Sequence, residues 1–369
     1  MSNLLFVGLD VDDTAFHATI IAQNTGETWY FKCRPNSTKL IEKLLKVHGK
    51  PEDYRICYES TYLGFSLCRK LRDKGFNCDV IASSLIPELA GKKVKTDRCD
   101  SQKLGQFYMK DLLTIVHVPD EEDESERDLV RSRSLIKDQI VATKNRIQSI
   151  LRKTDLDYRQ ETGKKMLWSL EYKKWLTKKI KELKLTALKQ NLILLTSSLD
   201  NLEDSLKTYN SEIETLAKTE KYSTKVGALI SYRGIQILTA MKIITEIGDI
   251  KRFPHPRKLV SYLGLDIREF SSGGKEKKYG ITKMGNEVVR TALVEANQKS
   301  STKPTVSEAI KRRRENVPIE HTRIADKCMN RLFIKSNGLI KREKNKNKVK
   351  VACAREMVGF IWESLHVAS

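Results

Sequence analysis

The sequence lacks the features that mark zinc-binding, disulfide-bonded and membrane-spanning proteins. Its seven cysteines form no C-x-x-C pair, which argues against the common zinc and redox motifs. Their number is odd and several lie in apolar runs, which predicts buried free thiols in a reducing cytoplasm rather than a disulfide framework. No apolar run approaches the roughly 18 residues that a membrane span needs, and the N-terminus has no basic-then-apolar signal pattern. We therefore expect a soluble, cytoplasmic protein with no membrane partner.

Positive charge, by contrast, is abundant and unevenly distributed. The 369 residues include 68 Lys and Arg against 47 Asp and Glu, a formal net charge of +21. Residues 251–350 alone hold 26 Lys and Arg against 10 Asp and Glu. Solubility does not require such segregation, so this third of the chain predicts a nucleic-acid surface. Its run of Arg312, Arg313 and Arg314 supplies candidate phosphate contacts.

Four carboxylates in the first hundred residues are the strongest chemical signal. Asp10 follows the apolar run 4–9, and Glu59 ends a second short β-rich run. Asp97 and Asp100 are three residues apart at the start of an expected helix, a spacing that places both on one face. Converging carboxylates repel one another unless a cation lies between them. Hard Mg²⁺, for which Mn²⁺ can substitute, is the natural cation, so the quartet predicts metal-assisted phosphodiester chemistry.

Residues 1–120 alternate short β-rich runs with helical patterns and predict an α/β domain. Three strands, 4–9, 15–22 and 28–33, come first. The later expected elements are helix 38–48, strand 54–58, helix 61–74, strand 77–82, helix 97–110 and strand 113–117. Three strands followed by alternating units resemble an RNase H-like fold. Asp12 and Asp13 are equally consistent with turn residues.

Residues 121–221 predict a long α-helical coiled-coil spacer. The acidic segment 121–126 suits a helix N-terminus, and residues 153–165 are expected to break two helical stretches. The later stretch carries apolar residues at unbroken 3-4 spacing, which is a heptad seam. They are Leu185, Leu188, Leu192, Leu195, Leu199, Leu202, Leu206, Tyr209, Ile213 and Leu216. Two interpretations remain open: self-association through the seam, and an antiparallel helix pair within one chain.

Residues 222–369 predict a mostly α-helical domain. Helix 236–247 is bounded by Gly234 and Gly248, which fits either a helix–hairpin–helix phosphate site or ordinary packing with a glycine C-cap. Further on, Ser271 and Ser272 precede a pair of glycines, and His255 is expected to be a loop residue. A serine on such a loop can be reached by a phosphodiester. The cations that could hold the phosphate are Lys275, Lys283 and Arg290.

Two motif sets in this order resemble the DEDD transposases of the insertion sequence 110 family, relatives of the pilin-gene DNA invertases. The N-terminal set comprises Gly8-Leu9-Asp10, Tyr58-Glu59 and the stretch from Lys95 to Leu104. The C-terminal set comprises Ile247-Gly248-Asp249, Tyr262 to Leu265, Ser272-Gly273, Thr282 to Asn286 and Arg290. The family often has proline where this chain has Ile267.

The resemblance implies a RuvC-like first domain in which Asp10, Glu59, Asp97 and Asp100 bind metal. It implies that Ser272, rather than Ser271, is the nucleophile of the second domain. It further implies a covalent phosphoserine intermediate, double-stranded element and target DNA as substrates, and a structured bridge RNA that pairs with both. Dimers or tetramers would assemble through the coiled coil, and the bacterial protein would act at the nucleoid.

The resulting hypothesis is an RNA-guided DNA transposase with a DEDD metal site and a serine nucleophile. Three rivals remain open: a RuvC-like nuclease or Holliday-junction resolvase that acts by hydrolysis, a site-specific DNA invertase, and a non-enzymatic coiled-coil nucleic-acid-binding protein. The hydrolytic rival predicts that Ser272 is dispensable. The non-enzymatic rival predicts that Asp97 and Asp100 are dispensable.

Overall fold

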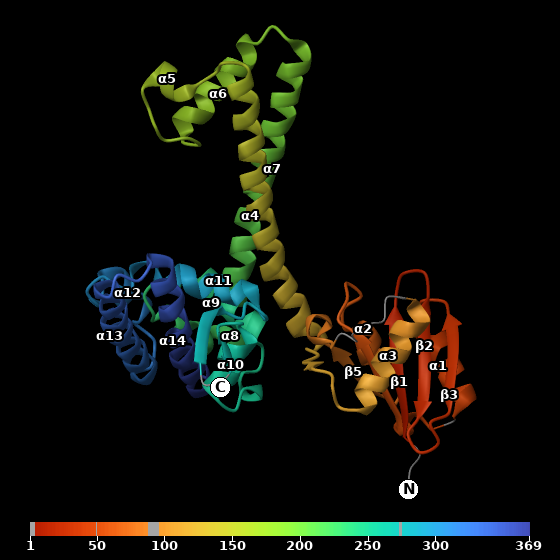
Figure 1. Ribbon diagram of the computed structural model, residues 1–369. Coiled ribbons are helices and arrows are strands. Elements are labelled where there is room, and N and C mark those ends of the chain that lie inside the picture. Colours follow the sequence, from red (N-terminus) through yellow and green to blue (C-terminus); the bar gives the residue numbers. More distant parts are fainter. Residues whose placement is uncertain (1–3, 49, 88–95, 273–274) are drawn as a thin grey trace. The chain divides into compact units, whose positions relative to one another are not determined.

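The computed structural model describes residues 4–48, 50–87, 96–272 and 275–369. The chain divides into two compact units, residues 1–120 and 121–369, and each is described by itself (Figure 1). In the described residues, no helix is both long and apolar enough to cross a membrane. Six of the seven cysteines are buried free thiols, as predicted, and Cys99 is exposed.

The first unit is a mixed six-stranded sheet with the strand order β3-β2-β1-β4-β5-β6. The first three strands pair antiparallel, and β1, β4 and β5 run parallel. The strands are β1 (Leu5–Val11), β2 (Phe16–Ala22), β3 (Thr28–Cys33), β4 (Tyr54–Glu59), β5 (Asn77–Ile81) and β6 (Ile115–Val116). The helices are α1 (Ser37–Val47), α2 (Ser66–Arg72) and α3 (Asp97–Met109). The mixed α/β sheet matches the prediction, although α2 and β6 are shorter than expected.

Alternation of side chains along the strands gives the sheet two different faces. Val7, Leu9 and Val11 of β1 belong to a core shared with α1 and α2. The intervening residues Gly8 and Asp10 therefore face α3. The same alternation in β4 places Cys57, which packs with Leu104 of α3, on the α3 face, and Glu59 follows it there. The α3 face is thus where the predicted carboxylates belong.

Gly8 allows α3 to approach the sheet very closely. A Cβ at this position would lie 2.0 Å from the carbonyl oxygen of Ser101 and 2.4 Å from the backbone nitrogen of Gly105. Gly105 lies on the opposite side of the same contact, where a Cβ would lie 3.2 Å from the Gly8 nitrogen. A buried hydrogen bond of 2.8 Å between the hydroxyls of Thr19 and Ser101 joins α3 to β2 beside it. The two glycines therefore set the position of the helix that carries Asp97 and Asp100.

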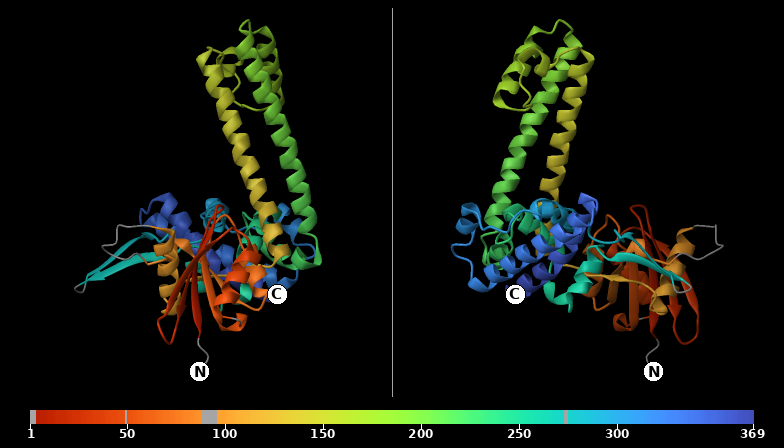
Figure 2. Two further views of the ribbon diagram at one scale, coloured as in Figure 1. Left: turned by 90° about the vertical axis from the view of Figure 1, so that its right-hand side faces the viewer. Right: turned by 60° about the vertical axis from the view of Figure 1, so that its left-hand side comes forward.

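The second unit begins with a pair of long helices, α4 (Glu121–Lys153) and α7 (Thr186–Leu216), which pack along each other in opposite directions (Figures 1 and 2). Leu192 and Leu199 of the predicted seam are buried in one cluster with Ile140 and Ile147 of α4. The seam is thus filled within the chain, which is the second of the two interpretations left open by the sequence. One end of the pair packs on helix α9 (Ile237–Ile247), and the other end carries α5 (Tyr158–Thr162) and α6 (Leu170–Glu182).

The remainder of the second unit is a helical domain with one β-hairpin. The hairpin is formed by β7 (Ile267–Ser272) and β8 (Lys275–Ile281). The helices are α8 (Glu220–Ile230), α9 (Ile237–Ile247), α10 (Pro256–Tyr262), α11 (Glu287–Ala296), α12 (Glu308–Arg313), α13 (Ile319–Lys341) and α14 (Lys346–Val367). Helix α9 confirms the predicted helix, and Gly248, at φ 64°, forms its C-cap by donating its backbone N–H to the Ile244 carbonyl.

The contact between Gly8 and α3 predicts a sharp response to one methyl group. We expect Gly8→Ala to displace α3 from the sheet. It should lower the free energy of unfolding by roughly 1–3 kcal/mol, the usual range for an overpacked site. Amide hydrogen exchange should become faster throughout α3. The matched control is Gly338→Ala in α13, where an added Cβ would meet no atom within 4 Å. Unchanged exchange in α3 of Gly8→Ala would show that the contact does not hold the helix.

Candidate active site

Asp10 and Glu59 lie near the ends of two neighbouring strands. Strands β1 and β4 pair in parallel, with Leu9 opposite Tyr58. The next residue of each strand is one of the two predicted carboxylates. Because carboxyl ends of parallel strands meet at the same edge of a sheet, Asp10 and Glu59 share that edge as well as the α3 face. Both are partly exposed, so the edge is open to solvent.

Helix α3 brings two further carboxylates toward the same place. Thr96 caps the helix by accepting a hydrogen bond from the Cys99 backbone N–H, at 3.2 Å, which places Asp97 and Asp100 in the first turn. Burial raises the pKa of Asp10, and the negative charges of Asp97 and Asp100 raise it further. The structure thus brings at least three of the four predicted acids into electrostatic contact, where an added cation would relieve their repulsion.

His17 belongs to this group, and the sequence prediction missed it. It lies directly opposite Asp10 in the antiparallel β1–β2 ladder and is only 8% exposed. Its Nε2 lies 3.3 Å from Asp97 Oδ2, and its Nδ1 lies 2.7 Å from the Tyr30 hydroxyl. A hairpin between β1 and β2 was predictable, but the exact register that aligns His17 with Asp10 was not.

The donor set fits a divalent cation in its chemistry, though not yet in its spacing. Carboxylate oxygens are the ligands that Mg²⁺ and Mn²⁺ prefer. In the described ranges, however, no three His, Cys, Asp or Glu side chains are grouped closely enough to hold an ion as they stand. Metal binding would therefore have to draw these side chains together. Asp12 is not one of them, because its Oδ1 accepts hydrogen bonds of 2.8 Å from the N–H and hydroxyl of Thr14, as the turn interpretation predicts.

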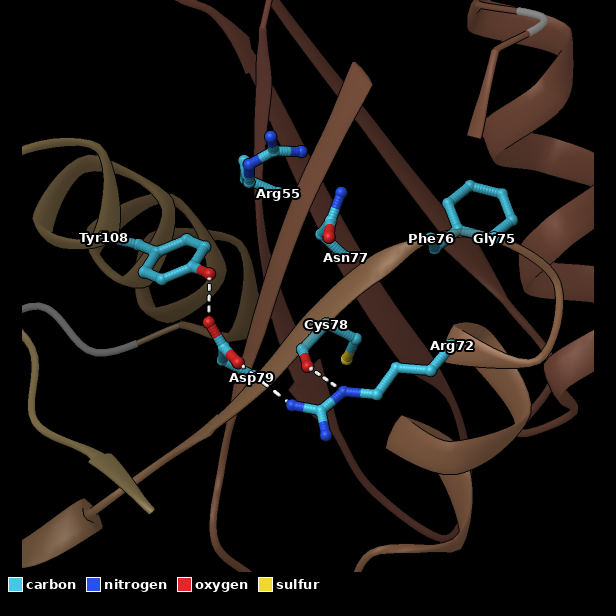
Figure 3. A pocket seen from close by; sticks show the side chains of 8 residues that line it. All are labelled: Arg55, Arg72, Gly75, Phe76, Asn77, Cys78, Asp79 and Tyr108. Carbon is cyan, nitrogen blue, oxygen red and sulfur yellow. Dashed lines mark hydrogen bonds and ion pairs between the residues drawn. The ribbon is translucent and has the colours of Figure 1, made fainter. Parts of the chain in front are cut away.

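A hollow of the first unit lies away from these carboxylates (Figure 3). This cavity of about 590 Å³ is at the opposite ends of β4 and β5 from the carboxylates. Three of its polar side chains are joined to one another: the Tyr108 hydroxyl donates to Asp79 at 2.6 Å and Arg72 contacts the same carboxylate at 3.1 Å. Arg55 and Asn77, which also line this cavity, both donate to the Glu52 carbonyl, so its described polar side chains already have partners within the chain.

Ser272 is the last residue of β7, so it ends a strand and does not lie on a glycine-flanked loop as predicted. The register pairs it with Lys275 and pairs Ser271 with Glu276. Gly273 and Gly274, and the side chains of Ser271, Ser272 and Lys275, lie outside the described part of the structure. His255 is not a loop residue either: it caps α10, and its Nδ1 accepts a hydrogen bond from the Arg257 N–H at 3.1 Å.

The segment that follows the hairpin packs closely against the end of α10 through the predicted motif residues. Gly285, at φ 139°, lies where a Cβ would be 2.2 Å from the Tyr262 carbonyl oxygen. The Asn286 backbone N–H donates to that same oxygen at 2.8 Å, and its side chain caps α11. The motif from Thr282 to Asn286 thus fixes the return of the hairpin into α11.

Several cations predicted to bind phosphate have partners inside the chain. Arg290 is buried and donates to the Leu263 carbonyl at 2.9 Å. Arg313 donates to the Ile235 carbonyl, at 2.6 Å. Arg314 likewise contacts the Ser231 carbonyl and Asp326. These three guanidinium groups hold the turn between α8 and α9 and the end of α10, a structural role that the sequence prediction did not include. Lys283 and Arg312 are exposed, as the prediction requires.

A buried carboxylate joins this domain to the long helix pair. Glu246 of α9 is 3% exposed and accepts two hydrogen bonds from Arg131 of α4, at 2.6 and 2.8 Å. A third comes from the side-chain amide of Asn286, at 2.7 Å. Burial by itself would raise the pKa of Glu246, but these donors and the charge of Arg127 outweigh it and lower the pKa. One carboxylate therefore connects α4, α9 and the N-terminus of α11.

Comparison with known proteins covers both units. Residues 7–155 match the DEDD transposase model of the IS110 group, and residues 227–311 match the transposase model of the IS116/IS110/IS902 family. The y4qE protein of Sinorhizobium fredii, which is named as a transposase, is 33% identical over 97% of this chain and 87% of its own length. The chain belongs to the IS110 family of transposases.

Other relatives agree with this assignment. The transposase of insertion element IS1533 from Leptospira borgpetersenii is 26% identical over 93% of this chain and 99% of its own length. The transposase of IS1111A from Coxiella burnetii is 34% identical over 29% of each chain. Membership makes this chain an enzyme that cuts and rejoins DNA, and the DEDD domain implies dependence on a divalent metal.

The Glu246 connection predicts a pH-dependent loss of stability. Because the folded-state pKa is lowered, the contribution of Glu246 is complete above the unfolded-state pKa and is lost as the pH falls through the folded-state value. We expect Glu246→Gln to lower the free energy of unfolding by about 2–3 kcal/mol at pH 7, since hydrogen bonds to a charged group are lost. Urea unfolding is measured at pH 7 and at progressively lower pH. The difference in the free energy of unfolding between Glu246→Gln and wild type should become smaller as the pH falls. Glu214→Gln, at an exposed site on α7, is the control.

Proposed function

We propose that this transposase combines a magnesium site on the α3 face with a serine nucleophile on the β7–β8 hairpin, and that RNA guides its choice of DNA. The observation that supports the metal site most strongly is the raised pKa of Asp10 beside Asp97 and Asp100. Acids that repel one another at an open sheet edge are what a cation-dependent phosphodiester enzyme needs. The expected place of action is DNA at the bacterial nucleoid.

In this proposal Asp10, Glu59, Asp97 and Asp100 hold Mg²⁺ or Mn²⁺ through their carboxylate oxygens. When bound, the metal would neutralise charge on the scissile phosphate and favour attack on it. Asp10 and Glu59 contribute from rigid strand ends, whereas Asp97 and Asp100 contribute from a helix held by Gly8. His17 orients Asp97 through Nε2 and is itself oriented by Tyr30.

Ser272 is the proposed nucleophile. Its hydroxyl oxygen attacks a backbone phosphorus, so that an Oγ–P bond forms while one P–O bond of the DNA strand breaks. The serine proton leaves with the attack, and the departing DNA oxygen is protonated. A hydroxyl end of a second DNA strand then reverses the exchange and releases the serine. Each step replaces one phosphodiester with another, so rejoining requires no external energy source. The carboxylates and Ser272 belong to different compact units.

Guidance by a bridge RNA and assembly into dimers or tetramers are further parts of the proposal, supported by the resemblance to the family. Base pairing would supply sequence choice, and the protein would then need to hold only backbone and shape. Lys283 and Arg312 are exposed cations suited to phosphate contacts. Lys275, Arg290, Arg313 and Arg314 complete the proposed set. Most of the seam is packed within the chain, so assembly through the coiled coil would use the outer faces of α4 and α7.

The covalent step can be tested by trapping the adduct. Purified protein with its co-purifying RNA, Mg²⁺ and labelled element-end and target DNA is analysed on a denaturing gel. We expect a protein-linked DNA band that disappears in Ser272→Ala and falls at least about 100-fold in Asp97→Asn, because the metal site and nucleophile act together. Ser271→Ala is the matched control and should retain the band.

Two results would contradict the proposal. Cleaved DNA without a protein-linked band, unaffected by Ser272→Ala, would establish hydrolysis by a RuvC-like nuclease or resolvase. A protein-linked band that persists in Ser272→Ala but is lost in Ser271→Ala would move the nucleophile by one residue.

The position of His17 predicts an effect on metal affinity that does not depend on turnover. Outer partners of metal ligands typically contribute 10–100-fold to affinity or activity. We expect His17→Phe to weaken Mn²⁺ binding by about that factor, measured by electron paramagnetic resonance of free Mn²⁺, while His17→Asn restores part of it. His48→Phe is the control, since His48 pairs with Asp53 in the same unit at 2.7 Å. Equal affinities for His17→Phe and wild type, with weaker binding by Asp97→Asn, would remove His17 from the site.

A further inference from the structure

The helix pair of the second unit separates its charge between a shaft and a tip. We define the stalk tip as residues 152–189, which include α5 and α6, and the shaft as residues 121–151 and 190–221 (Figure 1). The tip contains 12 Lys and Arg against 5 Asp and Glu, a net charge of +7. The shaft contains 9 against 13, a net charge of −4. Positive charge is therefore concentrated at the tip, although the total charge of residues 121–221 is small.

Four of the five acids of the tip, all except Asp155, are already engaged by neighbouring groups. Glu161 pairs with Lys179 at 2.6 Å, and Glu171 pairs with Lys164 at 2.8 Å. Asp157 caps α5 by accepting backbone hydrogen bonds. Seven exposed cations of this described segment form no ion pair within the chain: Arg152, Lys153, Arg159, Lys165, Lys174, Lys181 and Lys184. Their charge is available to an external anion.

The tip is a rigid support for these cations. The rings of Tyr158 and Tyr172 lie 5.1 Å apart, and Trp168 lies 4.9 Å from Tyr172. Tyr172, Leu176 and other apolar residues of α6 continue into the buried core of the helix pair. Both views of Figure 2 show α5 and α6 gathered at the end of the two long helices. A folded support of this kind fixes the backbone positions from which these cations project.

The lysines of α6 form a row on its outer face. Tyr172, Leu176 and Ile180 are buried and recur every four residues. Lys174, Lys178 and Lys181 have the spacing i, i+4, i+7 and are exposed, so they share the opposite side of the helix. Lys178 has a side chain that is 76% exposed, and its acid contact, to Glu182, is long, at 3.8 Å.

We propose that the stalk tip is a second DNA-binding surface, which holds the phosphate backbone of a duplex without reading its sequence. The proposal rests on membership of a transposase family, whose substrate is DNA, and not on the metal site or on Ser272. Ten of the twelve tip cations are lysines, which suit phosphate as point charges but lack the planar fork with which arginine reads guanine. Helix α4 extends roughly 33 Å from Arg131, which contacts α9, to Lys153 of the tip. A duplex of the same length contains about ten base pairs.

Salt-dependent binding by the full-length protein tests this proposal. Affinity for a 40-base-pair duplex of arbitrary sequence is measured in EDTA at a series of salt concentrations. We expect the triple variant Lys174→Gln, Lys178→Gln, Lys181→Gln to reduce the slope of log affinity against log salt by about 2–3, since each phosphate contact contributes about 0.9. The control triple variant is Lys137→Gln, Lys207→Gln, Lys218→Gln, which removes the same charge from exposed positions on the shaft. It should change the slope by less than about 0.5.

Equal slopes for the two triple variants would overturn the proposal, whether both changed or neither did. Two further arms identify another partner. If the tip variant loses affinity only for a folded RNA of equal phosphate number, the tip is an RNA surface. If it loses affinity only for anionic lipid vesicles, the tip is a membrane surface. Either result would contradict the DNA proposal. Because EDTA removes the metal and no cleavage is measured, a negative result here leaves the adduct experiment on Ser272 unaffected.

Discussion

The close approach of α3 to β1 is the constraint on which the first unit depends. A helix normally packs on a sheet through side chains, but at Gly8 the backbone of α3 contacts the backbone of the strand. The consequence is chemical, because it places the first turn of α3 within electrostatic reach of Asp10. The charges of Asp97 and Asp100 raise the pKa of Asp10, so the fold holds these acids close together against their mutual repulsion. Acids held close together against their repulsion are typical of functional sites and not of residues that only pack a core.

In the second unit, one buried carboxylate connects several helices. Glu246 is inaccessible, yet its pKa is lowered because Arg131 and Asn286 donate to it. Arg131 belongs to the long helix pair, and Asn286 starts the helix that follows the β7–β8 hairpin. Glu246 therefore links the helix pair to the residue at which the chain returns from the hairpin into α11. Arg290, Arg313 and Arg314 fix the neighbouring backbone turns by donating to carbonyls.

Most of the first unit could be predicted from its sequence because strand periodicity is a local property. The short β-rich runs that lead to Asp10 and Glu59 identify both strands, whereas the face on which the acids lie follows from the packing in the structure. His17 was missed because its role depends on hairpin register, which is not local. Charge alone did not reveal the carbonyl contacts of Arg313 and Arg314, since sequence does not tell which cation will find a backbone carbonyl. The heptad seam showed that α7 needs a partner but could not show that the partner is α4 of the same chain.

The central claim is that the α3 face assembles a metal site from strand ends and one helix turn. Anomalous scattering from crystals soaked in Mn²⁺ tests it most directly, because the ion is located without reference to activity. The account predicts a Mn²⁺ peak within coordination distance of Asp10 and of at least one of Asp97 and Asp100, with the carboxylates drawn closer than they lie without metal. Ordered Mn²⁺ elsewhere in the molecule, with these side chains unmoved, would contradict it.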